Sequence, residues 1–325
     1  MQRWITLIER DMNFNLLFMI VDFFSNRIFE RVKSDKLYSY MSQKGIEKLF
    51  LQDQLKYGFL DIDNSNTWTM DFTNKIIQDI KRIRDTYLIG QLPAGISHEI
   101  YFLANEVMAS TDRPIFSVLL IGSASRRAMH TQSDIDLLVV AGDKFQFRPK
   151  SSVRRAQVEV LSRDDFRTAF CRGDELVIWA IKHGLIIHDN LFIFDFYGYT
   201  HANIGKHSIL RKRKLIYNLT EDICTSKSIS TERLRAKLGS LIYQMARYIL
   251  ILDGEVPLAK RELADQVRRY SPDLAGLIAG YESEPSMDSE NLTKLFFRVR
   301  RAFSSHVGAI DRQRPNRPPT LQSSG

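Results

Sequence analysis

The architecture can be predicted from two stretches, LLIGSASRR at residues 119–127 and SDIDLLVV at residues 133–140. The first is an apolar run of strand length that ends in a Gly-Ser turn. Ten residues after that turn, the second stretch opens with Asp-x-Asp. Residues two apart on a strand point to the same side, so Asp134 and Asp136 are predicted to project together. Two neighbouring carboxylates repel each other unless a cation lies between them, and the pattern therefore predicts a Mg²⁺ site at the start of a buried strand.

The Gly-Ser turn has the chemistry of an anion site. Gly122 lets the backbone approach a phosphate closely, and the Ser123 hydroxyl, with the free N–H groups of a following helix, would face the anion. Arg126 and Arg127 lie one turn further along. A guanidinium there would hold phosphate oxygens whose negative charge grows as pyrophosphate leaves. These four residues are therefore predicted to bind a triphosphate.

A third apolar stretch, QVEVL at residues 157–161, offers a further carboxylate. Glu159 lies inside this alternating run, which is typical of a strand, and Asp164 or Asp165 are alternatives just beyond it. A third carboxylate would complete the ligands of two Mg²⁺ ions that bracket an in-line phosphoryl transfer. Glu159 is thus predicted to be a catalytic metal ligand.

The order of these elements resembles the DNA polymerase beta superfamily of nucleotidyltransferases. More narrowly, it is similar to the minimal nucleotidyltransferase and kanamycin-nucleotidyltransferase-like branches. The resemblance covers residues 114–190, and the family pattern is matched by Gly122, Ser123, Asp134, Asp136 and Glu159.

This resemblance implies an α+β fold in which a mixed sheet is flanked by helices. It also implies dependence on two Mg²⁺ ions and transfer of NMP from an NTP to an acceptor hydroxyl, with release of pyrophosphate. That is a reaction of the EC 2.7.7 type, and ATP is the NTP expected. The acceptor, whether a small molecule, a protein or RNA, is not specified by any pattern in the sequence.

Composition places the chain among ordinary globular proteins. Its 325 residues are 44% apolar and 26% charged, which excludes the collagen-like and wholly disordered classes. Cys171 and Cys224 are too few for a disulfide scaffold and lack the spacing of a zinc site. The apolar run at residues 15–24 is interrupted by Asp22 and is shorter than the roughly 20 residues that a membrane span needs. Because no signal peptide is evident, a cytoplasmic protein without a membrane partner is expected.

Changes in sequence pattern divide the chain into four parts. Near the N-terminus, helical stretches lead to a candidate hairpin with strands at residues 59–62 and 67–70, an arrangement typical of a winged helix. After residue 205 the apolar spacing is helical throughout. The predicted parts are a helical N-terminal domain and candidate winged helix, a catalytic domain, an all-α C-terminal bundle and a disordered tail, at residues 1–85, 86–205, 206–310 and 311–325.

Positive charge is concentrated in the C-terminal bundle. The chain has 46 Lys and Arg against 38 Asp and Glu, a formal charge of +8, and residues 206–270 contain 14 of these basic residues against 7 acidic ones. Such a surface attracts a polyanion such as NTP or RNA, or is simply a solvated face. Arg301 and His306 match the Arg-x4-His spacing of HEPN ribonucleases, a spacing that also arises by chance.

Two other functions remain open from the sequence. One is a regulator in which the winged helix binds DNA and the nucleotidyltransferase fold senses NTP. Residues 1–70 carry no net charge, however, and this favours packing or dimerisation over binding of a DNA duplex. The other is a toxin–antitoxin or phage-defence component that modifies a protein or tRNA.

Overall fold

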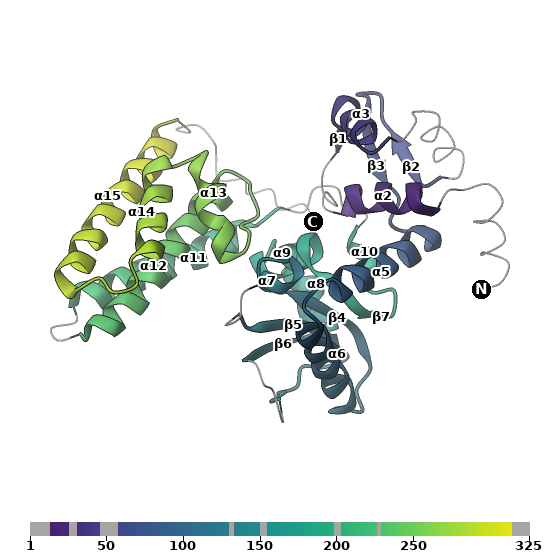
Figure 1. Cartoon of the computed structure of the whole chain (residues 1–325), viewed down its shortest axis with the longest axis horizontal. Helices are drawn as coiled ribbons and strands as arrows, with labels where there is room; N and C mark the ends of the chain where they lie inside the picture. The colour runs from purple at the N-terminus through teal and green to yellow at the C-terminus, as the bar shows by residue number, and fades with distance from the viewer. Residues whose placement is uncertain are drawn as a thin grey trace, which may run out of the picture. The chain divides into compact units, whose positions relative to one another are not determined.

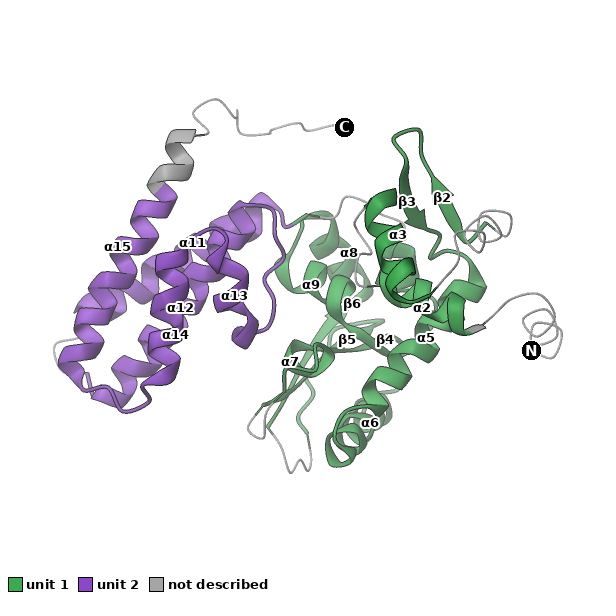
Figure 2. Cartoon of the chain, turned by 45° about the horizontal axis from the view of Figure 1, so that its top comes forward, with its two compact units in different colours: residues 1–203 green, residues 204–325 purple. Residues whose placement is uncertain are grey.

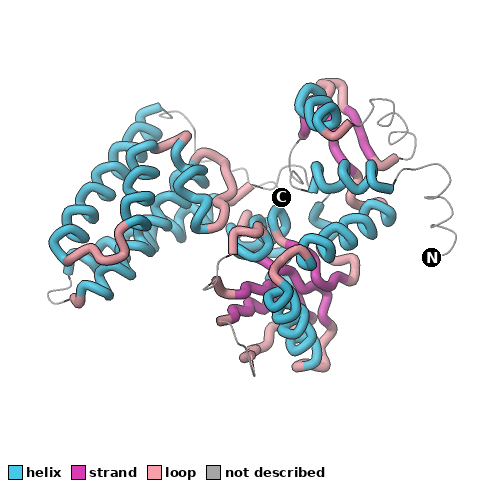
Figure 3. The backbone as a smooth tube through the Cα atoms, viewed as in Figure 1, coloured by secondary structure: helices cyan, strands magenta, loops and turns pink. Residues whose placement is uncertain are grey.

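A computed structural model describes residues 14–25, 31–45, 58–129, 133–149, 155–197, 203–225 and 229–313. The chain divides into two compact units, residues 1–203 and residues 204–325 (Figure 2). In the described residues all strands belong to the first unit, and the second unit consists of helices and loops (Figure 3). The α+β fold class predicted from the sequence is confirmed.

The first unit is organised around a mixed four-stranded sheet (Figure 1). Its order is β6-β5-β4-β7, in which β5 runs parallel to β6 and β4 runs antiparallel to both β5 and β7. The C-terminal end of β4 and the N-terminal ends of the other three strands therefore lie together along one side of the sheet, across the strand ends. We call this side the site edge. The strands span Ile115–Ile121 (β4), Ile135–Ala141 (β5), Ala156–Ser162 (β6) and Leu185–Asp189 (β7).

Helices cover both faces of this sheet. Helix α6, Ala94–Ala109, buries Ile100 and Leu103 against the face that carries Leu120 and Leu137. Successive strand residues point to opposite faces, so the alternate positions, Asp136 among them, lie on the other face. Helices α8, Arg163–Cys171, and α9, Glu175–His183, pack against the sheet there, and the short α10, Phe194–Tyr197, packs its aromatic rings on α8.

Local signals in the sequence determine where these helices begin. The Asp174 side chain accepts a hydrogen bond from the Leu176 amide at 2.9 Å and caps α9, and Ser162 accepts one from the Asp165 amide at 3.0 Å and caps α8. Such caps satisfy N–H groups that have no partner within the helix.

The N-terminal lobe, residues 14–70, contains a second, smaller sheet. Helix α2 (Phe14–Ser25), β1 (Val32–Lys33) and α3 (Ser34–Gln43) precede the hairpin of β2 (Leu60–Ile62) and β3 (Thr67–Met70). The antiparallel order β1-β3-β2 is the strand order of a winged helix. Residues 46–57, which would supply the helix before the hairpin, lie outside the described residues.

The hairpin turn is held by one carboxylate. Asp63 accepts hydrogen bonds from the hydroxyls of Ser65 and Thr67, each at 2.6 Å, and from both of their amides. These bonds, that of the Ser65 hydroxyl first, hold the pKa of Asp63 below its usual range. The turn predicted from residues 63–66 is thus formed by a short-range hydrogen-bond network.

Helix α5, Lys75–Gly90, joins the lobe to the sheet and crosses one predicted boundary. The division expected between residues 85 and 86 falls inside this helix. Asp85 is fully buried and accepts the Ile186 amide of β7 at 2.9 Å, while it pairs with Lys81 and Arg84 on its own helix. Arg84 also binds Asp22 of α2 through Nε at 2.5 Å. These buried ion pairs run from the lobe to the sheet, so α5 belongs to both.

The described part of the second unit consists of helices packed around α12. This helix, Thr231–Leu252, buries Leu238, Leu241 and Ile249 among its neighbours. The other elements are α11 (Lys206–Thr225), the 3₁₀ turn η1 (Lys260–Glu262), α13 (Leu263–Arg268), α14 (Pro272–Ser283) and α15 (Ser289–Gln313). Most of the predicted tail, from residue 314 onward, lies outside the described residues.

Within α15 the Arg-x4-His pair does not share a helix face. Five residues correspond to about 140° around a helix axis, so Arg301 and His306 point in different directions. Arg301 is exposed, whereas the Nε2 atom of His306 lies 3.8 Å from Oδ2 of Asp253 at the end of α12.

Among the described helices, none combines the length and apolar character that a membrane crossing requires.

Replacing Asp85 tests how strongly the buried cluster holds the lobe on the sheet. Asp85→Ala leaves Lys81 and Arg84 buried without their shared carboxylate, and we expect the free energy of unfolding to fall by about 3–5 kcal/mol. Burial already lowers the pKa of Lys81 to about 8. Denaturant unfolding followed by circular dichroism measures the effect. The control is Asp79→Ala on the same helix, whose exposed ion pairs with Lys75 and Arg82 contribute about 1 kcal/mol or less.

Candidate active site

The turn after β4 places backbone directly against a carboxylate. Gly122 begins the single-turn helix α7, Gly122–Ser125, with a φ of +72°, in the left-handed region that favours glycine. A Cβ at this position would lie 2.2 Å from Oδ2 of Asp136, well inside van der Waals contact. Glycine is therefore required here both by the backbone conformation and by the space available.

The predicted carboxylate pair is brought together at the site edge. Asp136 lies between Ile121 of β4 and Gln157 of β6 in the strand register. Both carboxylates are half-buried. Burial, and next the negative charge of Asp134, raises the pKa of Asp136 to about 6. The repulsion between the two carboxylates is the electrostatic condition that a bound cation relieves.

These two side chains fit one divalent cation that is shared with a substrate. Mg²⁺ in proteins takes one or two carboxylates and fills its remaining positions with water and phosphate oxygens. Asp134 and Asp136 supply such carboxylates, and the Gly-Ser turn lies directly against Asp136 at Gly122. Over the described ranges, no group of three or more His, Cys, Asp or Glu side chains is arranged to hold a metal ion.

Glu159 lies further along β6 than this pair. Its partner in the register is Leu138, two residues or roughly 7 Å beyond the position beside Asp136. Its side chain is exposed. The alternatives Asp164 and Asp165 are in the first turn of α8, which begins where β6 ends, at the opposite edge of the sheet. The structure therefore does not gather these three candidates with the carboxylate pair.

Gln157 occupies the position next to the pair instead. Its Nε2 donates a hydrogen bond to Oδ2 of Asp134 at 3.1 Å, which orients that carboxylate. Gln157 belongs to the same alternating stretch as Glu159, and only the pairing of β6 with β5 shows which of the two lies beside Asp136. Gln157 therefore could not be identified from the sequence alone.

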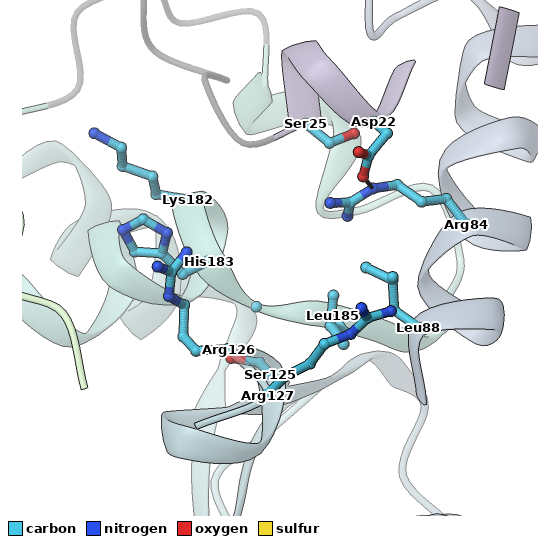
Figure 4. A pocket seen from close by; sticks show the side chains of 11 residues that line it. Asp22, Ser25, Arg84, Leu88, Ser125, Arg126, Arg127, Lys182, His183 and Leu185 are labelled. Carbon is cyan, nitrogen blue, oxygen red and sulfur yellow. Dashed lines mark hydrogen bonds and ion pairs between the residues drawn. The ribbon is translucent and has the colours of Figure 1, made fainter. Parts of the chain in front are cut away.

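A cationic pocket of about 240 Å³ lies beyond the end of α7 (Figure 4). Both arginines that the sequence predicts to bind phosphate, Arg126 and Arg127, line it. The other charged side chains on its wall are Lys182 of α9, Arg84 of α5 and Asp22 of α2. Four cations thus face one carboxylate in a small volume, which favours an anionic occupant.

His183 is a neutral member of this pocket wall. Its imidazole is largely buried, and its Nε2 atom has no hydrogen-bond partner among the described residues. Burial, with the positive charges of Arg126 and Lys182 nearby, lowers the pKa of His183 to about 3. The imidazole can therefore donate or accept one hydrogen bond without adding charge to the pocket.

Comparison with solved structures finds similarity to two proteins at low sequence identity. A nucleotidyltransferase-like protein from Exiguobacterium sibiricum is 15% identical, with 69% of this chain and 82% of that chain covered at a TM-score of 0.29. The spectinomycin adenyltransferase AAD(9) from Enterococcus faecialis, solved with ATP and spectinomycin, is 13% identical, with 63% and 99% covered at a TM-score of 0.40. No family model and no curated protein matches the chain.

Gly122→Ala tests the close approach at the turn. The added methyl group would collide with the Asp136 carboxylate in a backbone conformation that alanine avoids, so we expect loss of stability of about 1–3 kcal/mol and displacement of the carboxylate. Gly95→Ala is the matched control, because nothing lies within 4 Å of a Cβ there. Thermal unfolding of both variants measures the difference. Equal stability of the two variants would contradict the geometry described.

Asp136→Asn tests the electrostatic strain of the pair. The pKa of Asp136 is about 6 in the folded chain and 3.8 ordinarily, so the folded state binds the proton more tightly. The free energy of unfolding should therefore fall as the pH rises from about 4 to about 6 and then level off. Asparagine cannot ionise and removes this loss. At pH 7.5 we therefore expect the free energy of unfolding of Asp136→Asn to exceed that of the natural chain by about 1–2 kcal/mol, a value reduced for the partial exposure of the carboxylate.

The same variant separates charge repulsion from metal binding. Mg²⁺ should raise the thermal midpoint of the natural chain and leave that of Asp136→Asn almost unchanged, because the cation stabilises only a state with both carboxylates. Thermal unfolding with and without Mg²⁺ gives this comparison. A shift of the same size in both proteins would show that the ion binds elsewhere.

Proposed function

We propose that this chain is a Mg²⁺-dependent nucleotidyltransferase that transfers NMP from an NTP, with ATP the first to be tested, to an acceptor hydroxyl. The observation that carries the proposal is the contact of Gly122 with Asp136, since it holds the Gly-Ser turn directly against one of two carboxylates that project to the same side at the start of β5. A metal-bound triphosphate requires such an arrangement, with carboxylates for the cation and room for phosphate next to them.

Each residue of the site has a role in this proposal. Asp134 and Asp136 would hold the cation, which when bound would neutralise phosphate oxygens and lower the pKa of the acceptor hydroxyl. Gln157 keeps Asp134 oriented. Ser123, half-buried in the turn after Gly122, would donate its hydroxyl proton to a phosphate oxygen.

Arg126 follows one turn later and would face the departing phosphates. Its fixed positive charge would stabilise the negative charge that develops on pyrophosphate as it leaves. In the reaction the acceptor oxygen bonds to the α-phosphorus, the bond from that phosphorus to the bridging oxygen breaks, and the hydroxyl proton is released. The products are the nucleotidylated acceptor, pyrophosphate and one proton.

The N-terminal lobe favours a supporting role over DNA binding. Its strand order is that of a winged helix, which is the observation in favour of a nucleotide-sensing DNA-binding regulator. Its described charges are balanced, with Arg31, Lys33, Lys36 and Lys44 against Asp22, Asp35, Asp61 and Asp63. A domain that binds a DNA duplex instead needs an excess of basic side chains.

The proposal is therefore a cytoplasmic enzyme whose acceptor is a small molecule, a protein or tRNA.

Turnover of labelled nucleotide tests the proposed reaction. The full chain is incubated with each α-labelled NTP, Mg²⁺ and a cell lysate, and label is followed into protein, RNA and small metabolites. Asp134→Ala and Asp136→Ala should each lower transfer by about a thousandfold or more, because each removes a ligand of the cation that the reaction requires. Circular dichroism should show both variants folded.

Two further variants sharpen this test. Asp143→Ala, which removes an exposed carboxylate near the opposite edge of the sheet, should retain full transfer. Glu159→Gln asks whether this carboxylate takes part in spite of its place opposite Leu138. A loss as large as that of Asp136→Ala would make Glu159 the third ligand predicted from the sequence. Transfer that persists in Asp134→Ala and Asp136→Ala would refute the proposed function.

A further inference from the structure

The pocket beyond α7 gathers four positive charges from three separate segments. Arg126 and Arg127 come from the end of α7, Lys182 from the end of α9 and Arg84 from α5. Asp22 is the one carboxylate among its lining residues. Figure 4 shows Asp22 of α2 bonded to Arg84 of α5 on one side and Arg126 and Arg127 on another, while the side chain of Lys182 extends outward from the end of α9. A small cavity with this charge balance attracts a compact polyanion.

Arg84 is held in place by buried ion pairs, whereas Arg127 is exposed and lies on an uncommon backbone conformation. Arg84 is only 4% exposed, and its Nη1 and Nε bind Asp85 and Asp22. Arg127 has a φ of +56°, in the left-handed region that residues with a side chain rarely adopt. Its amide donates to the Ala124 carbonyl at 3.1 Å, which fixes this conformation. Strained residues of this kind cluster at ligand sites, because the surrounding structure must maintain them.

The pocket adjoins the place proposed for the NTP, because Arg126 lines the pocket and also follows the Gly-Ser turn. Its lining includes neither of the carboxylates at the site edge, nor Gly122 nor Ser123. Its volume of about 240 Å³ is below the 300 Å³ or more of pockets that enclose drug-sized ligands, so it suits a phosphate or diphosphate group better than a whole nucleotide. Two of its walls come from α2 and α5, which connect it to the N-terminal lobe.

We propose that this pocket is a second anion site, which binds the diphosphate or phosphate-ester group of a ligand other than the NTP. Arg127 and Lys182 would contact the anion from the side of the sheet, and Arg84 would contact it from the side of the lobe. The neutral imidazole of His183 would supply one further hydrogen bond from a buried nitrogen. The proposal concerns binding alone and does not depend on the transferase activity.

Asp22 would oppose this ligand. Its carboxylate binds the guanidinium of Arg84 on the pocket wall. A bound anion would therefore compete with Asp22 for Arg84 and would be repelled by the negative charge of Asp22. Removing that charge while keeping the shape of the side chain should therefore strengthen binding. A purely structural role of Asp22 gives no reason for such a gain.

Calorimetric titration of the full chain with inorganic pyrophosphate in EDTA tests the proposal. One site per chain is expected. Lys182→Ala and Arg127→Ala should each weaken binding about tenfold, because each removes a charge-assisted contact. Asp22→Asn should tighten it about threefold or more. Lys144→Ala and Arg148→Ala, exposed cations beyond the end of β5 at the opposite edge, are the matched controls and should change nothing.

Competition with nucleotide decides whether the site is separate. Pyrophosphate should bind equally well to Asp136→Asn and in the presence of saturating Mg²⁺ and non-hydrolysable ATP. Displacement of pyrophosphate, one for one, by that nucleotide would overturn the proposal and make the pocket a part of the NTP site. Absence of pyrophosphate binding, or the same affinity in the pocket variants and the control variants, would overturn it as well. Failure of NMP transfer in the natural chain would leave this result unaffected.

Discussion

Antiparallel pairing of β4 with β5 carries the end of one strand back to the start of the next, and at that point Gly122 meets the carboxylate of Asp136. The two strands are almost entirely buried, so their register is determined by the apolar side chains they share with the core. A slip of one residue would turn Asp136 toward α6 and the apolar face. Core packing thereby positions the turn and the carboxylates with respect to one another.

This geometry places two carboxylates that repel each other at the site of the proposed reaction. Two half-buried carboxylates share one side of β5, and the pKa of Asp136 rises because burial and its neighbour both penalise its charged form. The rest of the sheet compensates for this with fully buried apolar side chains such as Val118, Leu137 and Val139. Functional sites are commonly maintained in this way, by stability that resides elsewhere in the fold.

A second electrostatic centre, on α5, links the parts of the first unit. Asp85 binds the β7 amide of Ile186 and two cations of its own helix, and one of these, Arg84, continues to Asp22 in the lobe and to the pocket. The buried charges are paired, as burial of a charge requires. One consequence is that a helix expected to end a domain instead couples the lobe to the site edge. The division predicted between residues 85 and 86 falls inside this helix, because tertiary ion pairs leave no trace in local periodicity.

Local patterns in the chain were sufficient to predict the strand with Asp-x-Asp, the Gly-Ser turn before it and the hairpin around Asp63. Each depends on contacts between near neighbours, and these contacts follow from residue type and spacing. Local patterns could not predict two other features. One is that Gln157, and not Glu159, lies beside Asp136, and the other is that Arg84, Arg127 and Lys182 line one pocket. They depend on the register between strands and on the packing of segments up to 100 residues apart, where many pairings satisfy the same local pattern and only burial of the whole core selects one.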